Sequence, residues 1–202
     1  ANFQISQESI DMVNQKYHDL KHQIAVLRSE VRSEEKTDCL DRMEREIKIY
    51  ETQNKTGNEV LDAILTSKSI YCQGQNISLT CVADGRALHF MDTIDISSLF
   101  GNALDNAIES VRQIPEEESE KRLIHLSVVK QKGFVRIRVE NYCEKEPVLK
   151  DGMPVTTKKD TRFHGYGLKS IQSTARKYGG SVTASVKNHW FELRVLLPEK
   201  AE

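Results

Sequence analysis

The chain has 202 residues, and its 29 Lys and Arg against 30 Asp and Glu give a formal net charge of -1 at pH 7. This balance, together with the lack of a long basic run, excludes a protein that binds nucleic acid by neutralising phosphates. No apolar run approaches the roughly 20 residues that a membrane-spanning helix requires. The four cysteines show no CxxC spacing, so neither a zinc site nor a disulfide framework is expected, and a reducing cytoplasm is the simplest setting.

The first part of the chain carries a heptad pattern. Apolar residues recur at alternating spacings of three and four at Ile10, Val13, Tyr17, Leu20, Ile24, Leu27 and Val31, and again at Leu40, Met43, Ile47 and Tyr50. This spacing predicts a helical hairpin over residues 3–55 in a first domain of residues 1–57, and leaves open an extension of the second helix to about residue 67. One hairpin with so narrow an apolar stripe is too small to be stable alone, so we expect two copies to form a dimeric four-helix bundle.

Residues 58–202 differ in pattern and form the second predicted domain. The expected elements are a strand at 75–82, a helix at 94–112, strands at 123–129 and 134–139 joined by a turn at Lys132 and Gly133, a loop at 143–163, a helix at 165–178, and strands at 181–186 and 190–197. Helices and strands do not alternate strictly, which favours an α+β sandwich over a doubly wound sheet. A loop of about 20 residues without structure of its own is typical of a functional lid.

Two asparagines lie four residues apart on the helix predicted at 94–112. At this spacing Asn102 and Asn106 share one face of the helix. Asparagine is a poor helix former, so two asparagines are an unfavourable choice for an ordinary solvent-exposed helix surface. The alternative is that the pair simply forms part of a polar outer face of the helix. The amide carbonyl is a hard oxygen ligand that suits a Mg²⁺ ion bridging to phosphates.

Two glycines open the helix predicted after the loop, in the sequence HGYGL at 164–168. Glycine lets phosphates approach backbone N–H groups at the positive end of a helix. The pattern is neither a Rossmann fingerprint nor a P-loop, and a plain turn before a helix is the alternative.

Asn141 stands at the end of a predicted strand. A buried polar side chain needs a hydrogen-bonding partner, and the edge of a nucleobase is one candidate. The start of a β-turn is the alternative for this position.

His18 lies beside the apolar seam of the first predicted helix, in the sequence YHDLKH at 17–22. Asp19 can hydrogen-bond one ring nitrogen of His18 or take its proton, which leaves the other nitrogen nucleophilic. An ordinary surface histidine is the alternative. The spacing of His18 and His22 is one substitution from the HExxH signature of zinc proteases, but Asp is shorter than the Glu that serves as base there and no third ligand is evident, so a zinc site is disfavoured.

In their order along the chain, the Asn-rich helix, the strand with a polar end, the lid and the Gly-x-Gly-Leu helix start resemble the Bergerat nucleotide-binding fold of the GHKL superfamily, over about residues 58–198. The hairpin with His18 and Asp19 resembles the His-acid phosphoacceptor motif in the dimerisation helices of sensor histidine kinases. Most of these kinases carry an Asp that reads the adenine amino group where this chain has Asn141, and Asn there looks like the subfamily of quorum-peptide and citrate sensors.

The resemblance implies a role for each candidate residue. Asn106 matches the residue that holds Mg²⁺, and Asn102 stands where the hydrolysing gyrase, chaperone and mismatch-repair branches carry a general-base Glu, which favours the histidine-kinase branch. Glu109 replaces a Lys or Arg that often meets the phosphates, so we expect lid residues to supply that charge, with Lys158, Lys159 and Arg162 as candidates. The implied nucleotide-binding residues are Asn102, Asn106, Asn141, Lys158, His164, Gly165, Gly167 and Leu168.

The resemblance therefore implies the core of a two-component sensor histidine kinase, with ATP and Mg²⁺ as cofactors. His18, assisted by Asp19, would accept the γ-phosphoryl group and pass it to an aspartate in the receiver domain of a response regulator. The protein would be a homodimer and the cytoplasmic portion of a membrane-anchored sensor whose sensor region precedes Ala1. Two other hypotheses stay open: a GHKL protein that phosphorylates a partner or acts as a nucleotide-gated interaction module, and a hydrolysing ATPase.

Overall fold

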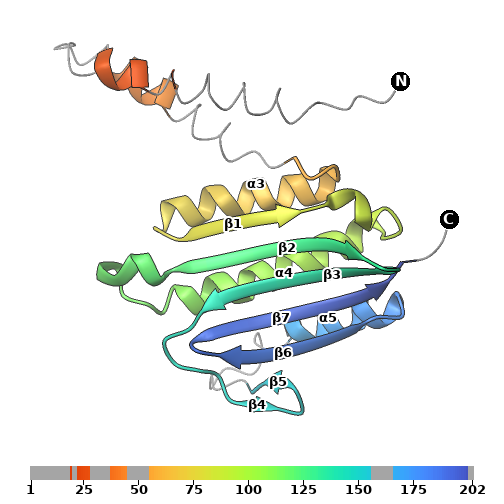
Figure 1. Cartoon of the computed structure of the whole chain (residues 1–202). Coiled ribbons are helices and arrows are strands. Elements are labelled where there is room, and N and C mark those ends of the chain that lie inside the picture. Colours follow the sequence, from red (N-terminus) through yellow and green to blue (C-terminus); the bar gives the residue numbers. More distant parts are fainter. Residues whose placement is uncertain (1–18, 20–21, 28–36, 45–54, 156–165, 200–202) are drawn as a thin grey trace, which may run out of the picture. The chain divides into compact units, whose positions relative to one another are not determined.

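The computed structural model describes residues 19, 22–27, 37–44, 55–155 and 166–199 (Figure 1). The chain divides into two compact units, residues 1–53 and residues 54–202. Because the positions of the two units relative to each other are not determined, each is described by itself.

The described parts of the first unit are helical at residues 22–27 and 37–44, as the heptad pattern predicts. Two seam residues, Ile24 and Leu40, are only 1% and 7% exposed. Two others, Leu27 and Met43, are 50% and 39% exposed, so the unit leaves part of its apolar seam uncovered. Pairing of two hairpins into a four-helix bundle stays a prediction.

The second helix of the hairpin does not continue to about residue 67. Residues 55–58 are not helical, and a separate helix, α3 (Glu59–Gly74), begins after them. The side chain of Asn58 caps α3, because its Oδ1 accepts a hydrogen bond from the Leu61 backbone N–H at 3.0 Å. The apolar residues after position 58 therefore belong to the second unit.

A five-stranded mixed sheet forms the centre of the second unit, in the order β1-β2-β3-β7-β6. Strands β1 and β2 are parallel, and every other neighbouring pair is antiparallel. The elements after α3 are β1 (Ser78–Ala83), the short 3₁₀ helix η1 (Gly85–Leu88), α4 (Thr93–Val111), η2 (Glu116–Lys121), β2 (Leu123–Gln131), β3 (Phe134–Tyr142), β4 (Leu149–Lys150), β5 (Met153–Pro154), α5 (Tyr166–Lys177), β6 (Ser181–Lys187) and β7 (Trp190–Pro198). The predicted α+β sandwich is confirmed.

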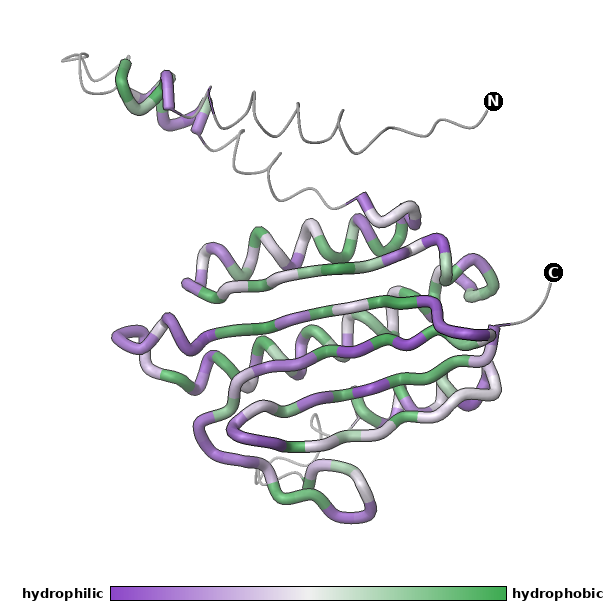
Figure 2. The backbone as a smooth tube through the Cα atoms, viewed as in Figure 1, coloured by the Kyte–Doolittle hydropathy of each residue, from purple (hydrophilic) through white to green (hydrophobic). Residues whose placement is uncertain are grey.

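The helices α3, α4 and α5 cover one face of this sheet, with α4 between the other two (Figure 1). Alternate residues of β3 and β7 point into the helical layer and are at most 3% exposed; they are Val135, Ile137, Val139, Leu193, Val195 and Leu197. Hydrophobic and hydrophilic residues alternate along α4 in Figure 2, because one side of the helix faces the core and the other does not. The core therefore fixes which side of α4 remains available for polar contacts.

The predicted loop at 143–163 contains structure that the sequence analysis misses. Strands β4 and β5 form a small antiparallel hairpin, and the carbonyl of Gly152 accepts a hydrogen bond from the Ala184 backbone N–H at 3.2 Å. The hairpin thereby covers part of the edge strand β6, whose backbone groups would otherwise be unpaired. Residues 156–163 lie outside the described residues, so the lid stays a prediction.

A buried arginine directly before β2 forms hydrogen bonds with the backbone that follows α3 and α4. Arg122 is 5% exposed, and its Nε and Nη2 donate to the carbonyl of Ile114 at 3.0 and 2.6 Å. Its Nη1 donates to the carbonyl of Gln75, the C-cap of α3, at 2.8 Å. Carbonyls near the carboxyl ends of helices carry partial negative charge, which suits this guanidinium, for which the described residues provide no carboxylate partner.

We expect Arg122→Met to lower the free energy of unfolding by about 3 kcal/mol, because bonds from a charged donor are lost and buried carbonyls are left unpaired. Urea denaturation of the full chain, followed by the fluorescence of Trp190, its single tryptophan, measures the change in the second unit. The matched control is Arg194→Met, because Arg194 is 45% exposed and forms a surface ion pair with Glu192. A loss above about 1 kcal/mol in this control, or equal losses in both variants, would contradict the prediction.

The cysteines differ in their exposure and therefore in their reactivity. Cys39 is exposed, whereas Cys72 and Cys143 are buried. Burial raises the pKa of Cys72 to about 11 and that of Cys81 to about 11, and it also raises the pKa of Cys143.

Because the thiolate is the reactive form, we expect Cys39 alone to react rapidly with a thiol reagent at pH 8. Rapid labelling of Cys72 or Cys81 in the native protein, located by peptide mapping, would show that this part of the core opens.

Candidate nucleotide-binding site

A half-buried side of α4 carries four uncharged polar residues at intervals of four: Ser98, Asn102, Asn106 and Ser110. We call this set the polar stripe. Residues at this spacing follow one another along one side of a helix. Members of the polar stripe meet groups from α5 and from β3, so segments that are distant in the sequence come together along one helix.

The two asparagines of the stripe face the first turn of α5. A methyl group in place of the Gly167 hydrogen would lie 3.4 Å from Oδ1 of Asn102 and 3.4 Å from Oδ1 of Asn106. The amide of Asn102 is oriented, because its Nδ2 donates to the carbonyl of Ser98 at 2.7 Å and a carbonyl can only accept. The amide oxygens of Asn102 and Asn106 therefore both lie beside the space that a side chain at position 167 would occupy.

This arrangement fits a magnesium ion with bound phosphates. Amide carbonyls are hard oxygen donors of the kind that Mg²⁺ accepts. The amino end of α5 presents backbone N–H groups and positive partial charge, which favour phosphate oxygens. Because Gly167 has no side chain, the space above the oxygens of Asn102 and Asn106 stays open to a ligand.

The other end of the polar stripe meets β3. Asn141 is 2% exposed, and its Nδ2 donates to Oγ of Ser110 at 3.0 Å and to the carbonyl of Tyr142 at 3.1 Å. Both amide hydrogens of Asn141 are thus used within the protein. Its carbonyl oxygen is the group that remains to accept a hydrogen bond from an amino group such as that of adenine.

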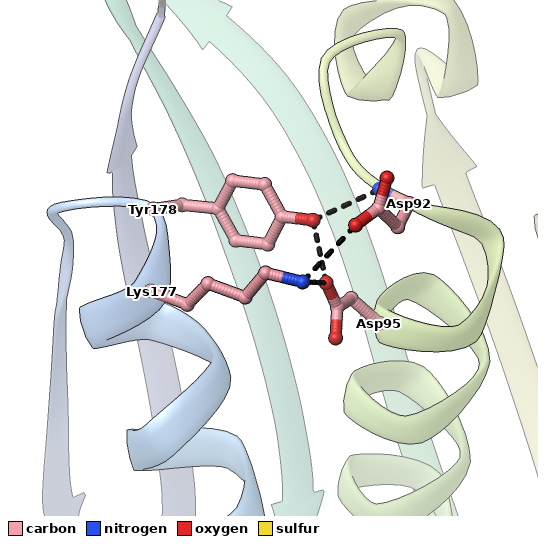
Figure 3. Close-up of polar contacts among 4 residues, drawn as sticks. All are labelled: Asp92, Asp95, Lys177 and Tyr178. Carbon is pink, nitrogen blue, oxygen red and sulfur yellow. Dashed lines mark hydrogen bonds and ion pairs between the residues drawn. The ribbon is translucent and has the colours of Figure 1, made fainter.

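Helix α5 lies along α4 and is attached to it at several points. The hydroxyls of Ser98 and Ser170 are 2.9 Å apart. At the far end, Figure 3 shows Lys177 and Tyr178 pointing from the end of α5 toward Asp92 and Asp95 at the start of α4. We call these four residues the Lys177 cluster.

The Lys177 cluster is held by charged and neutral hydrogen bonds. Lys177 Nζ lies 3.0 Å from Oδ2 of Asp92 and 2.6 Å from Oδ2 of Asp95. The Tyr178 hydroxyl donates to Oδ2 of Asp95 at 2.5 Å and accepts from the Asp92 backbone N–H at 2.9 Å. The hydrogen bond from Lys177, and then that from Tyr178, hold the pKa of Asp95 below its usual value, so Asp95 stays ionised at neutral pH.

A hollow of about 320 Å³ lies between α3 and α4, lined by Lys68, Tyr71, Asp105, Ile108, Glu109 and Arg112. Lys68 bonds to Asp105 across it at 2.5 Å. No pair of amide oxygens lines this hollow, so it does not match the chemistry of the polar stripe. Glu109, at the position where the resemblance to GHKL proteins implies a Lys or Arg, is one of these lining residues.

The structure brings together three of the predicted site residues, Asn102, Asn106 and Gly167, and it places Asn141 against the end of the same stripe. Leu168 packs against the core, where it anchors the first turn of α5. Asp19 is exposed in the first unit. The predicted residues outside the described ranges are His18, Lys158, Lys159, Arg162, His164 and Gly165.

The serines of the site and the Lys177 cluster are not among the residues predicted from the sequence. Ser98 and Ser110 continue the four-residue spacing of the asparagines in both directions, which is the signal that could have found them. Ser170 and the Lys177 cluster have no such local signal, because they acquire partners only when α5 packs on α4.

The described residues contain neither a cluster of acidic, His or Cys metal ligands nor a membrane-spanning helix. Within those ranges, no group of three His, Cys, Asp or Glu side chains is placed to hold a metal ion. None of the described helices has the length and apolar character needed to cross a membrane.

Comparison with known proteins gives the family. Residues 91–198 match the family model of the GHKL domain, which includes the polar stripe, Asn141 and Gly167. Among curated proteins, no sequence matches this chain.

Solved structures share the fold at low sequence identity. Two nucleotide-free structures of the catalytic domain of histidine kinase ThkA match with TM-scores of 0.55 and 0.54, at 19% and 18% identity, covering 72% and 71% of this chain and 93% and 94% of those chains. The histidine kinase AdeS of Acinetobacter baumannii has a TM-score of 0.48 at 10% identity, over 93% of this chain and 97% of that chain, which is too low to carry an argument. Because the family model covers more than half of the sequence, the chain belongs to the GHKL domain family, with an ATP-binding domain in the fold of histidine kinase catalytic domains.

Proposed function

We propose that the chain is the cytoplasmic core of a two-component sensor histidine kinase, which phosphorylates His18 from ATP and passes the phosphoryl group to a response regulator. The observation that carries this proposal is the convergence of the Asn102 and Asn106 oxygens beneath Gly167. The GHKL family and the fold shared with histidine kinase catalytic domains support a nucleotide site at this place.

Each part of the proposed site has its own task. Asn106 holds Mg²⁺ through its carbonyl oxygen, and Asn102 adds a second oxygen beside it. The first turn of α5 binds the phosphates through its backbone N–H groups. Asn141 accepts from the adenine amino group at the other end of the stripe. Lys158 belongs to the proposed lid, which adds positive charge over the phosphates. His164 and Gly165 follow the lid, at the proposed phosphate-binding start of the next helix.

The proposed reaction transfers the γ-phosphoryl group of ATP to His18. One ring nitrogen of His18 forms a bond to the γ-phosphorus, while the bond from that phosphorus to the β,γ-bridging oxygen breaks and ADP leaves. Asp19 hydrogen-bonds the other ring nitrogen or takes its proton. Positioning and charge neutralisation supply most of the rate enhancement in reactions of this kind.

Asn102 also bears on the choice between transfer and hydrolysis. A general base must take a proton from water, and the neutral amide of Asn102 cannot do so. Its nitrogen is moreover engaged with the carbonyl of Ser98. The polar stripe holds no ionisable side chain, which favours transfer to a nucleophile on the protein over hydrolysis.

The first unit supports a homodimer. Leu27 and Met43 occupy seam positions of the heptad pattern, yet they are half or more than a third exposed. A second hairpin would cover these side chains and complete a four-helix bundle that presents His18. In the proposed arrangement a membrane sensor region precedes the hairpin and controls the kinase.

We expect the full chain to label itself when it is incubated with γ-labelled ATP and Mg²⁺. The label should be stable in alkali and labile in acid, as phosphohistidine is, and it should disappear in His18→Gln. The matched control is His22→Gln, which should label like the wild type because His22 is an exposed histidine close in sequence that is not the proposed acceptor.

Other outcomes of this experiment would contradict the proposal. Label that persists in His18→Gln would show another acceptor. Binding of ATP without any label would favour a nucleotide-gated interaction module or a kinase for a partner protein. Rapid release of inorganic phosphate without phosphoprotein would favour a hydrolysing ATPase.

We expect Gly167→Ala to weaken the binding of ATP with Mg²⁺ at least about tenfold, a change of about 1.4 kcal/mol. The added methyl group would fill the space above the oxygens of Asn102 and Asn106, while alanine favours the helix itself. Calorimetric titration of the full chain measures the affinity.

The matched control for Gly167→Ala is Gly101→Ala. Gly101 also lies in a helix, directly before Asn102, and no atom within 4 Å would meet a side chain there. The control should bind ATP like the wild type. Equal affinities in wild type and Gly167→Ala would place the phosphates elsewhere.

A further inference from the structure

We propose that the Lys177 cluster is a positioning device for the nucleotide site: it sets how far α5 reaches along α4, and thereby the affinity for the phosphate part of the nucleotide. The inference rests on the proposed function, because it assumes that the polar stripe binds a nucleotide. The four residues of the cluster touch neither Asn106 nor Gly167 in any described contact, so they act through the placement of α5.

The contacts between the two helices run in antiparallel order. Lys177 meets the start of α4, Ser170 meets Ser98 one turn further on, and Gly167 meets Asn102 and Asn106 beyond that. Ten residues of helix separate Lys177 from Gly167, a length of about 15 Å. Since α5 is a rigid rod over this length, a shift at one end moves the other end by a similar amount.

Apolar packing alone does not fix this register. The buried face of α5 is small and consists mainly of Ile171 and Ala175, with Leu168 partly buried beside them. Hydrophobic burial is non-directional and changes little when a helix slides by a fraction of a residue. Charged hydrogen bonds are short and directional, so the Lys177 cluster, together with the Ser98–Ser170 contact, holds α5 at one position along α4.

The cluster is also suited to its place at the start of α4. A cation near the positive amino end of a helix is unfavourable by itself, whereas a carboxylate there is favourable. Asp95 lies in the first turn of α4 and Asp92 is its N-cap, and both stand between the helix end and Lys177. The ring of Tyr178 packs edge-on against Phe90, with centroids 5.8 Å apart, which ties the cluster to the core.

The base end of the site does not depend on α5. Ser110 belongs to α4 and Asn141 to β3, and their hydrogen bond involves no residue of α5. A displacement of α5 therefore changes the space for the metal and phosphates and leaves the contacts proposed for adenine in place. This separation gives the proposal a readout that a general loss of stability would not produce.

The experiment compares two ligands in titrations of the full chain, followed by NMR: ATP with Mg²⁺, and adenosine, which lacks phosphates. In Lys177→Met we expect the affinity for ATP with Mg²⁺ to fall about fivefold or more, because a displaced α5 no longer presents a preorganised phosphate site. The affinity for adenosine should stay within about twofold of the wild type, because the base end does not move. Lys177→Arg keeps the positive charge, so its affinity for ATP with Mg²⁺ should be close to that of the wild type.

Two further variants keep the result interpretable. Lys68→Met removes a surface ion pair with Asp105 on the α3 side of α4 and should change neither affinity. Tyr178→Phe removes only the hydroxyl while keeping the ring against Phe90, so it should fold normally and still weaken ATP binding selectively.

The possible failures can be told apart. Unchanged ATP affinity in both Lys177→Met and Tyr178→Phe would overturn the inference, as would equal losses for ATP and adenosine. A loss in Lys68→Met as large as in Lys177→Met would overturn it as well, because any ion pair on α4 would then act alike. A wild-type chain that binds neither ligand would overturn the proposed function itself.

Discussion

The second unit depends on the two different sides of α4. One side is buried in the core, and the other carries the polar stripe at intervals of four residues. Because an α-helix has 3.6 residues per turn, each step of four residues is slightly more than one turn, and successive members of the polar stripe are rotated a little further around the helix axis. This rotation lets Ser98 face α5 and Ser110 reach Asn141 on β3. A single helix thus connects the start of α5 with the end of a central strand, and the proposed nucleotide site lies along that connection.

The fold of the second unit is largely predictable because strand and helix periods are local properties of the sequence. The helix at 94–112 and the hairpin at Lys132 and Gly133 appear where their patterns indicate. The extension of the second hairpin helix to about residue 67 is wrong because the apolar spacing of α3 mimics a continued seam. Gly57, with a φ of 91°, and the capping side chain of Asn58 mark the start of α3. The β4–β5 hairpin is too short for its pattern to be seen.

The site is predictable only in part, for a physical reason. Asn102 and Asn106 attract attention because asparagine is unfavourable inside a helix, and Gly167 because glycine is unfavourable at most helical positions. Serine carries no such signal, since it is common on helix surfaces. Ser98 and Ser110 differ from other serines only in continuing the four-residue spacing, and Ser170 gains its role from a tertiary contact between two helices, which no local pattern encodes.

The neutrality of the polar stripe has a consequence for how Mg²⁺ is held in the proposed reaction. Mg²⁺ gives up its waters reluctantly and is usually held by carboxylates or by substrate phosphates. The amide oxygens of Asn102 and Asn106 carry no net charge, so by themselves they hold the ion weakly. In the proposed site the phosphates would supply most of the attraction for Mg²⁺, and the amide oxygens of Asn102 and Asn106 would orient the ion that the nucleotide carries. The polar stripe would then recognise the complex of Mg²⁺ and nucleotide through the positions of its two amide oxygens. For this recognition, the open space that Gly167 leaves beside these oxygens is more important than charge.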